Sequence, residues 1–303
     1  VGSIEKKMGI KGSPTCVMNY DGATGWLVGE ENKGLACMFT MMNDARFQVG
    51  LQGLGAAEAS YQGALSYARD RLQSRAPQGV QQPDQKADAI LHQPDVKKML
   101  LTQKALTEGC RALAMLYAQQ MDVEKYTSDE RHEQAKKVIA FLTPICKGFM
   151  TDMATEVTNI GIQVYGGHGY VREWGMEQFV RDARIAMIYE GANGVQALDL
   201  VGRKLAQNGG RAVFAFFKAV DDFVAANGGD ETLKPFVEPL ARARKDLEAA
   251  TMWFMENALE NPDHAGAGST PYMHLFGVTG IAFMWAMMAR VANDKLAAAK
   301  DGD

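Results

Sequence analysis

Cysteine and histidine are scarce in this 303-residue sequence, which contains four of the first and five of the second. No two cysteines form a C-x-x-C pair and no two histidines stand four residues apart, so the usual spacings of zinc ligands are missing. Disulfide frameworks belong mainly to small secreted chains. Cys16, Cys37, Cys110 and Cys146 therefore predict reduced thiols in a cytoplasmic protein without a metal site.

A strong excess of one charge and long apolar runs are also missing. The formal net charge is −4, which argues against a nucleic-acid partner because such partners favour a basic face. The first residues are polar and hold no apolar segment typical of a secretory signal. The longest apolar run near the other end covers residues 280–286, too few to cross a bilayer. We predict no nucleic-acid partner and no membrane span.

Apolar residues make up 47% of the sequence, and many recur at steps of three and four residues. This periodicity predicts α-helices that bury one face. The first predicted helix, over residues 35–74, carries small residues such as Gly53 and Ala57 that would let a second helix approach closely. Further helices are predicted over residues 96–120, 129–162, 179–188, 194–206, 211–227, 231–260 and 270–299, with the stretch 261–269 separating the last two.

β-Structure is predicted near the N-terminus, over residues 15–20 and 25–29. Two short strands cannot close a sheet alone, so this segment favours a piece of a longer protein. The pattern changes after Lys33-Gly34, and Asn208-Gly209-Gly210 predicts a boundary. We predict a β-segment over residues 1–35, a helical bundle over 36–207 and a further helical unit over 208–303.

One carboxylate is a candidate for chemistry: Glu190, between Tyr189 and Gly191. A carboxylate against an aromatic ring is partly desolvated, and a neighbouring glycine lets a ligand or another backbone come close. These surroundings suit a general base that takes a proton from carbon. The alternative is that Glu190 caps the next helix, because acidic residues are common at helix starts.

Three other groups could bind a ligand. The clustered glycines of residues 163–170 would let backbone N–H groups approach a phosphate or a planar ring, or would simply form a turn. The arginines of residues 69–75 would complement the end of the first helix or bind a pyrophosphate. Arg46 lies among apolar neighbours and must meet Asp44, another acidic residue or an anionic ligand.

The order and spacing of several blocks resemble the C-terminal half of the acyl-CoA dehydrogenase family. The resemblance covers residues 1–205, and its last two blocks together are specific. The blocks are Met8-Gly9-Ile10, Ser13-Pro14-Thr15, Asn43-Asp44-Ala45-Arg46, Tyr67-Ala68-Arg69-Asp70-Arg71, residues 163–169, Arg181-Asp182-Ala183-Arg184 and Ile188-Tyr189-Glu190-Gly191. Residues 208–303 resemble the C-terminal extension of larger members, including those that act on methylthio-propanoyl-CoA and similar short substrates.

The resemblance implies a mainly α fold: a C-terminal four-helix bundle, a short remnant of the middle β-domain and an additional C-terminal helical unit. It implies FAD-dependent α,β-dehydrogenation of an acyl-CoA, with electrons passed to an electron-transfer flavoprotein. It also implies a homodimer or homotetramer in which FAD is shared between subunits. Relatives with this fold leave two alternatives, an acyl-CoA oxidase-like enzyme that uses oxygen and a non-catalytic helical or DNA-repair-associated protein.

The resemblance further assigns roles to single residues. Glu190 matches the base that removes the α-proton while a hydride passes from the β-carbon to flavin N5. Members with the base on the first bundle helix carry it where this sequence has Ala45, which leaves Glu190 as the candidate. The substrate contacts would be Asn43, Arg46 and Gly191. Arg71 and Gln73 match positions that reach the FAD of a neighbouring subunit, and the loop that holds the adenine end of that FAD is matched by Gln163, Gly166 and Gly167. The segment after the base that contacts FAD is matched by Ala192, Asn193 and Gly194.

Two positions depart from the family pattern. Ala192 stands where the family usually has threonine, which removes a hydroxyl contact. Ser74-Arg75 stands where a phenylalanine and a glycine usually follow the arginine of the first helix.

Overall fold

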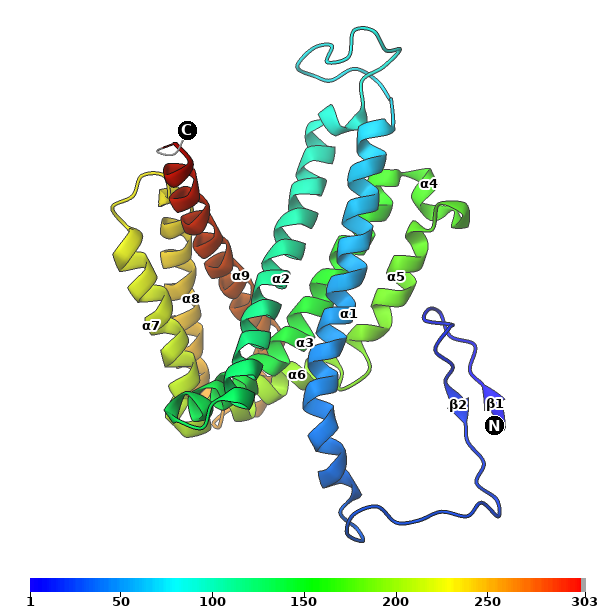
Figure 1. Ribbon diagram of the computed structural model, residues 1–303, viewed down its shortest axis with the longest axis vertical. Coiled ribbons are helices and arrows are strands. Elements are labelled where there is room, and N and C mark those ends of the chain that lie inside the picture. Colours follow the sequence, from blue (N-terminus) through cyan, green and yellow to red (C-terminus); the bar gives the residue numbers. More distant parts are fainter. Residues whose placement is uncertain (301–303) are drawn as a thin grey trace. The chain divides into compact units, whose positions relative to one another are not determined.

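The structure is a computed structural model that describes residues 1–300, and it is mainly helical, as predicted (Figure 1). Its contacts divide the chain into two compact units. The first holds residues 1–107 and 151–190, and the second holds residues 108–150 and the chain from 191 onward. Helices α2 (Pro94–Tyr126) and α3 (Glu130–Tyr165) contribute to both units. The domain limits at residues 35 and 207 stay a prediction.

Helix α1 (Gly34–Asp70) packs closely within the first unit because it carries small residues. A Cβ added to Gly53 would lie 3.2 Å from the Cβ of Ala154 and 3.3 Å from the Cα of Thr151. The close approach of a second helix at this position is therefore confirmed, and the second helix is α3. Two buried clusters form the core here: Ala57, Ala154 and Val157, and Ala64, Ala68, Leu100 and Val164.

Helix α1 ends at Asp70, four residues before the predicted end at residue 74. Arg71 is already extended, with φ −74° and ψ 112°, and Leu72 pairs with Ala89 in an isolated antiparallel bridge. Pairing of the loop with itself therefore overrides the helical periodicity. Short elements complete the first unit: η1 (Ile90–His92), α4 (Gly167–Tyr170), η2 (Arg172–Trp174), α5 (Met176–Arg184) and η3 (Ile185–Met187).

The N-terminal segment forms a two-stranded antiparallel ladder of β1 (Ser3–Ile4) and β2 (Cys16–Val17). The prediction of a strand over residues 25–29 is wrong, because β2 pairs with β1 instead and residues 25–28 have no regular structure. The turn after β1 contacts α5: the N–H of Ile10 lies 2.6 Å from Oδ1 of Asp182, and Arg181 donates to the carbonyl of Met8 at 3.0 Å. The block Met8-Gly9-Ile10 thus contacts the block Arg181-Asp182-Ala183-Arg184, although the two are distant in sequence.

The second unit adds three helices, α7 (Arg211–Asn227), α8 (Lys234–Asn257) and α9 (Pro262–Lys300), to the parts of α2 and α3 that it contains (Figure 1). α8 packs against both α7 and α9. Before them come α6 (Asn193–Asp199), the π-helical η4 (Leu200–Lys204) and η5 (Gln207–Gly210). Aromatic rings fill the core, with Phe276 contacting both Phe141 and Phe216 at centroid distances of 5.2 and 4.7 Å.

Helix α9 begins at Pro262, so the prediction that residues 261–269 separate two helices is wrong. The side chain of Asn261 accepts a hydrogen bond from the N–H of His264 at 3.1 Å, which caps the helix start. Proline fits the first helical position because the missing N–H has no partner there. These local start signals outweigh the glycines that follow.

Helix α9 is also long and apolar enough to cross a membrane when only length and composition are considered. The stretch Pro262–Ala299 reaches a mean hydropathy of 1.6, and 44% of its most apolar window is buried within the structure. A single helix of this kind is weak evidence, since a core helix passes the same test. The absence of a membrane span stays a prediction.

An apolar cavity of about 370 Å³ lies in the second unit among α2, α3, α7 and α9. Gly280 of α9 lines it, and a Cβ added to Gly280 would meet no atom within 4 Å. Three residues earlier, a Cβ on Gly277 would run into the ring of buried Phe149. The two glycines therefore stand in opposite surroundings on the same helix.

Replacing Gly280 by alanine should stabilise the protein by about 0.5–1 kcal/mol, because alanine loses less backbone entropy in a helix and the methyl group has room. The matched variant Gly277→Ala should destabilise it, since the added methyl group must displace the Phe149 ring. Urea unfolding of both variants measures these shifts. Equal shifts of the two urea midpoints would contradict the different surroundings that we describe for Gly280 and Gly277.

Candidate functional site

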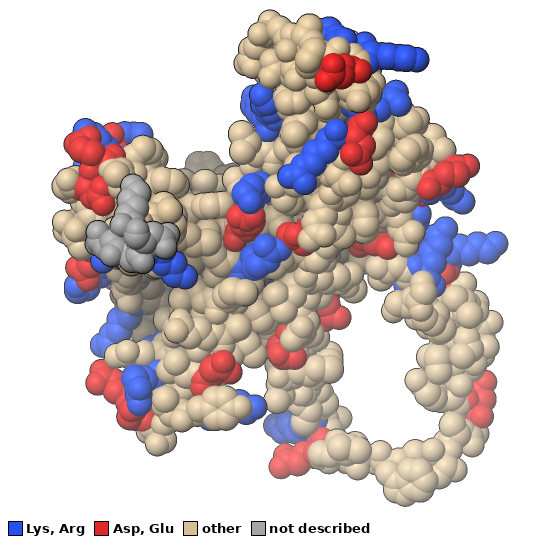
Figure 2. Space-filling model, turned by 45° about the horizontal axis from the view of Figure 1, so that its top comes forward, with Lys and Arg blue, Asp and Glu red and all other residues tan. Residues whose placement is uncertain are grey.

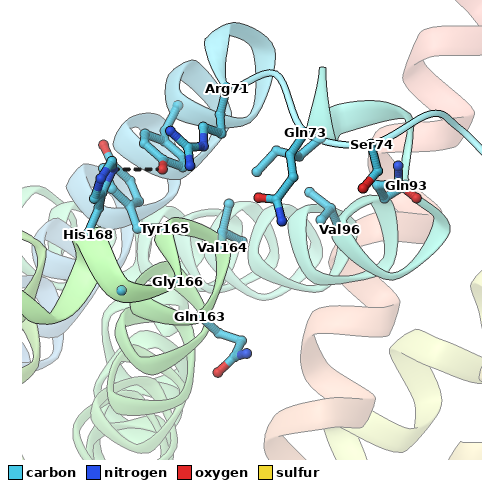
Figure 3. A pocket seen from close by; sticks show the side chains of 13 residues that line it. Arg71, Gln73, Ser74, Gln93, Val96, Gln163, Val164, Tyr165, Gly166 and His168 are labelled. Carbon is cyan, nitrogen blue, oxygen red and sulfur yellow. Dashed lines mark hydrogen bonds between the residues drawn. The ribbon is translucent and has the colours of Figure 1, made fainter. Parts of the chain in front are cut away.

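A cavity of about 590 Å³ lies in the first unit, where the end of α1, the loop of residues 71–93, the start of α2 and the glycine-rich turn after α3 come together (Figure 3). Its size is that of a small-molecule site. The structure thus brings together these residues that the resemblance assigns to a cofactor: Arg71, Gln73, Gln163, Gly166 and Gly167. The other lining residues are Tyr67, Ser74, Ile90, Gln93, Val96, Val164, Tyr165 and His168.

The glycine-rich segment forms a turn whose backbone is open to the cavity. Gly166 has φ +60° and ψ −136°, a conformation that glycine adopts without steric cost. A Cβ added to Gly166 or Gly167 would meet no atom within 4 Å. The turn interpretation is therefore confirmed, and the turn leaves room for a phosphate or a flat ring beside its backbone.

Aromatic rings support one side of this cavity. The rings of Tyr67 and Tyr165 stack with centroids 4.0 Å apart. The Tyr67 hydroxyl lies 2.9 Å from Nδ1 of His168, whose ring stacks on Trp174 at 4.4 Å. Burial raises the pKa of Tyr165, whose hydroxyl donates to the carbonyl of Gly63. No sequence pattern predicts this cluster, because rings about a hundred residues apart leave no local signal.

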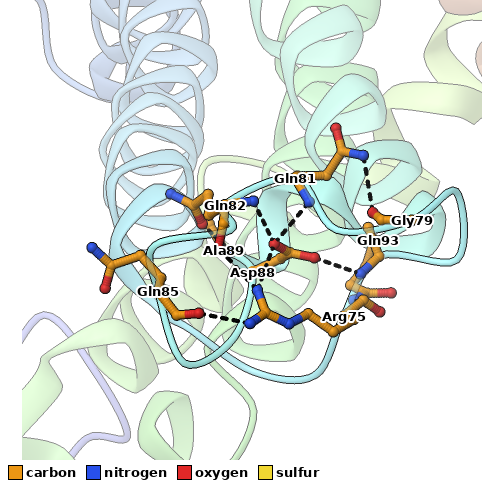
Figure 4. A network of polar contacts seen from close by, with 9 residues as sticks. Arg75, Gly79, Gln81, Gln82, Gln85, Asp88, Ala89 and Gln93 are labelled. Atoms are coloured by element: carbon orange, nitrogen blue, oxygen red, sulfur yellow. Dashed lines mark hydrogen bonds and ion pairs between the residues drawn. The ribbon is translucent and has the colours of Figure 1, made fainter.

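The loop of residues 71–93 is organised around one buried carboxylate, that of Asp88 (Figure 4). It accepts hydrogen bonds from the N–H groups of Ala76, Gln81 and Gln82 at 2.9, 3.0 and 2.7 Å, and it pairs with Arg75 at 3.2 Å. Burial works to raise the pKa of Asp88, but these hydrogen bonds outweigh it and lower that pKa to about 2. The carboxylate therefore stays ionised and keeps the loop closed.

The arginines near the end of α1 have separate surroundings. Arg75 donates to the carbonyls of Gln82 and Gln85 as well as to Asp88, so it binds the loop rather than a ligand. Arg71 lines the cavity, while Arg69 lies exposed in the last turn of α1, where a cation complements the helix dipole. At the two positions that depart from the family pattern, Arg75 thus binds the loop and Ser74 lines the cavity.

Glu190 ends the first unit in an uncommon backbone conformation, with φ +55°. Its side chain is half-buried. The hydroxyl of Tyr189 donates to Oε1 of Gln52 on α1, which fixes the preceding residue. The next helix, α6, has Ala192 at its N-cap and no capping bond from a side chain. The interpretation of Glu190 as the helix cap is therefore wrong.

The predicted contact residues after Glu190 belong to the second unit. Gly191 has φ +87° and its carbonyl accepts a hydrogen bond from Nζ of Lys147 at 2.7 Å. The side chain of Asn193 is buried and bonded to Lys147 and to the carbonyl of Gly148, so it faces α3. Ala192 is half-buried and Gly194 is exposed. Cofactor contacts of residues 192–194 stay a prediction.

The predicted substrate residues Asn43 and Arg46 lie on α1. Asn43 is exposed, and Arg46 is half-buried. The Nε atom of Arg46 is buried, and among the described residues it has no hydrogen-bond partner. Of the three alternatives for Arg46, this atom pairs neither with Asp44 nor with another acidic residue among the described ones, and an anionic ligand remains.

Comparison with known proteins places this geometry in a family. A family model described as acyl-CoA dehydrogenase, C-terminal domain matches residues 32–205, and one described as acetyl-CoA dehydrogenase C-terminal like matches residues 216–303. The chain therefore belongs to the acyl-CoA dehydrogenase family, as the resemblance predicted.

Two curated relatives cover nearly the whole chain. The 3-methylmercaptopropionyl-CoA dehydrogenase of Ruegeria pomeroyi is 44% identical over 99% of this chain and 50% of the relative. The broad-specificity linear acyl-CoA dehydrogenase FadE5 of Mycobacterium tuberculosis is 32% identical over 100% of this chain and 52% of the relative. The chain thus spans about half the length of the curated relatives it matches.

Solved structures share the fold. ACDH-11 of Caenorhabditis elegans in complex with C11-CoA matches with a TM-score of 0.75 and 21% identity over 93% of this chain and 46% of that chain. An acyl-CoA dehydrogenase of Bacillus anthracis complexed with FAD matches with a TM-score of 0.65 and 22% identity over 95% and 49%. These matches confirm the predicted mainly α fold.

Removing the Asp88 carboxylate should open the loop beside the cavity. In Asp88→Asn, the N–H groups of Ala76, Gln81 and Gln82 lose a charged acceptor, and their hydrogen exchange should become roughly tenfold faster or more. Asp84→Asn, an exposed change in the same loop, is the control. Unchanged exchange in Asp88→Asn would contradict the role of Asp88.

The stabilisation of the loop by the Asp88 carboxylate should be lost at low pH. Because the pKa of Asp88 is lowered from 3.8 to about 2, the stabilisation is complete above pH 3.8 and is lost as the pH falls through about 2. Amide protection in the loop, followed from pH 5 to pH 2, measures this loss. Loss of protection already near pH 5 would contradict it.

Proposed function

We propose that the protein catalyses the α,β-dehydrogenation of an acyl-CoA thioester, with Glu190 as the base and with the 590 Å³ cavity holding part of an FAD that is shared between subunits. The observation that carries the proposal is the convergence of Arg71, Gln73, Gln163 and the open glycine turn on one cavity in a chain of this family. Two relatives are named for this reaction class, and one structure of the same fold holds FAD.

The residues of the cavity fit a dinucleotide. Arg71 can donate paired hydrogen bonds to a pyrophosphate. The side-chain amides of Gln73 and Gln163 can bind the polar groups of an adenosine or a ribityl chain, and the turn at Gly166 and Gly167 has space for a close approach. FAD, when bound, supplies the acceptor for the hydride that leaves the β-carbon of the substrate.

Glu190 would take the proton from the α-carbon as the carbon–carbon double bond forms. Gly191 beside it presents no side chain, so the thioester can approach the carboxylate. The buried and unpartnered Nε of Arg46 supports a contact with an anionic part of the substrate, and Asn43 lies three residues before it on the same helix. Acidic and basic side chains are mixed on the face in Figure 2, which favours a small substrate over nucleic acid.

We also propose an electron acceptor, an oligomeric state and a cellular location. Electrons would pass to an electron-transfer flavoprotein, and a homodimer or homotetramer would share FAD between subunits. A cytoplasmic location agrees with the four free cysteines. Burial raises the pKa of Cys110 to about 12 and that of Cys146 as well, so neither forms a thiolate at neutral pH.

Glu190→Gln should lower kcat by roughly 10²–10⁴-fold, the usual contribution of a general base, and should leave FAD bound. Turnover of an acyl-CoA with a dye acceptor and the flavin absorbance of the purified protein give the two values. Glu173→Gln, an exposed change in the first unit, is the control. Full turnover in Glu190→Gln would remove Glu190 from the mechanism, and fast reoxidation by air would favour the oxidase.

Arg71→Met should weaken FAD binding by roughly 10–100-fold, because a hydrogen bond from a charged donor to the pyrophosphate is lost. Arg69→Met removes an exposed arginine two residues away that does not line the cavity, and it should retain FAD. Fluorescence titration of apoprotein with FAD measures both. Equal affinities of the two variants for FAD would contradict the proposal that this cavity binds FAD.

A further inference from the structure

A lysine is fully buried next to the segment that follows Glu190. Lys147 lies on the part of α3 that belongs to the second unit, and its exposed fraction is 0%. Its Nζ atom donates to the carbonyl of Gly191 at 2.7 Å and to Oδ1 of Asn193 at 2.8 Å. Lysine is almost never fully buried unless its amino group is satisfied, so these bonds are specific features of the fold.

Lys147 contacts the backbone at a point where the chain adopts an uncommon conformation. Glu190 and Gly191 both have positive φ angles, +55° and +87°. A conformation of this kind persists where its surroundings fix it. The amide of Asn193 donates to the carbonyl of Gly148 at 3.0 Å, and the amide of Gln196 lies 3.4 Å from the carbonyl of Gly191. The chain directly after Glu190 is thereby tied to α3.

We infer that Lys147 is a positioning residue for Glu190: its buried amino group fixes the Gly191 carbonyl and thereby the direction in which the Glu190 side chain leaves the backbone. The inference rests on the proposed function. Lys147 does not touch substrate in this role. A base must lie within hydrogen-bond reach of the proton it abstracts, and displacement of a reacting group by about 1 Å can cost about 10²-fold in rate.

A purely structural role for Lys147 makes a different prediction. If Lys147 only stabilised the fold, its replacement would lower the melting temperature and leave the rate constants of the folded protein unchanged. A positioning role lowers kcat while KM and FAD content stay as they were, because substrate and cofactor still bind. The slowed step would be proton removal, which exchange of the substrate α-hydrogen with D₂O reports directly.

The test uses Lys147→Met in the FAD-loaded full chain, with kcat, KM, flavin absorbance and α-hydrogen exchange measured well below its melting temperature. We expect kcat and exchange to fall by roughly 10²-fold, with KM changed less than about threefold. Lys147→Gln keeps one donor for the Gly191 carbonyl and should lie between Lys147→Met and the unchanged protein. Thr251→Val removes two other buried hydrogen bonds of the second unit, to the carbonyl of Leu247 and to the hydroxyl of Tyr272, and should lower stability alone.

Each outcome decides the inference. An unchanged kcat in folded Lys147→Met, or an equal loss of kcat in Thr251→Val, overturns it. If Lys147→Met does not fold, Lys147→Gln decides alone: a kcat lowered at constant KM supports the inference and an unchanged kcat overturns it. Glu190→Gln, measured in parallel, separates the two proposals. If that variant keeps full turnover, Glu190 is not the base and both fail; if it is inactive while kcat of Lys147→Met is unchanged, only the positioning role fails.

Discussion

The conformation of two consecutive residues, Glu190 and Gly191, depends on hydrogen bonds made on either side of them. A non-glycine residue with positive φ costs about 1–3 kcal/mol, and a hydrogen bond from a charged donor contributes about 1.5–3 kcal/mol. Lys147 is such a donor, and its two bonds go to the Gly191 carbonyl and to the side chain of Asn193, directly after Glu190. On the other side, Tyr189 is bound to Gln52 within the first unit. Each unit thus fixes its own end of the segment.

The cavity of the first unit is built by the same kind of constraint. Ser74 and Gly166 both have positive φ angles, +61° and +60°, and they line the cavity. The Asp88 carboxylate holds the loop that contains Ser74, and stacked rings support the turn that contains Gly166. A site held in advance loses less conformational entropy when a ligand binds. The polar interior of the loop therefore shapes the cavity as well as the loop.

Helix existence followed from the sequence, and helix ends followed less well. Residues 211–227 form α7 as predicted, because periodicity and flanking glycines agree there. α1 ends early since the loop pairs with itself, and α9 starts early since Asn261 and Pro262 form a local cap. The predicted site residues Arg71, Gln73, Gln163, Gly166 and Gly167 meet in one cavity. Lys147 and Asp88 were missed because a single charged residue in a helix or loop carries no periodic signal.

The sequence by itself determined the helical character, the family and the identity of the candidate base, because periodicity and ordered blocks are properties of the chain written out in one dimension. Tertiary structure decided what surrounds those blocks. Only folding shows that Asp88 accepts three N–H groups, that Tyr67 meets His168 and that Lys147 reaches Gly191. The physical reason is that burial and hydrogen bonding depend on which distant segments come together, and a residue type alone does not specify its partner.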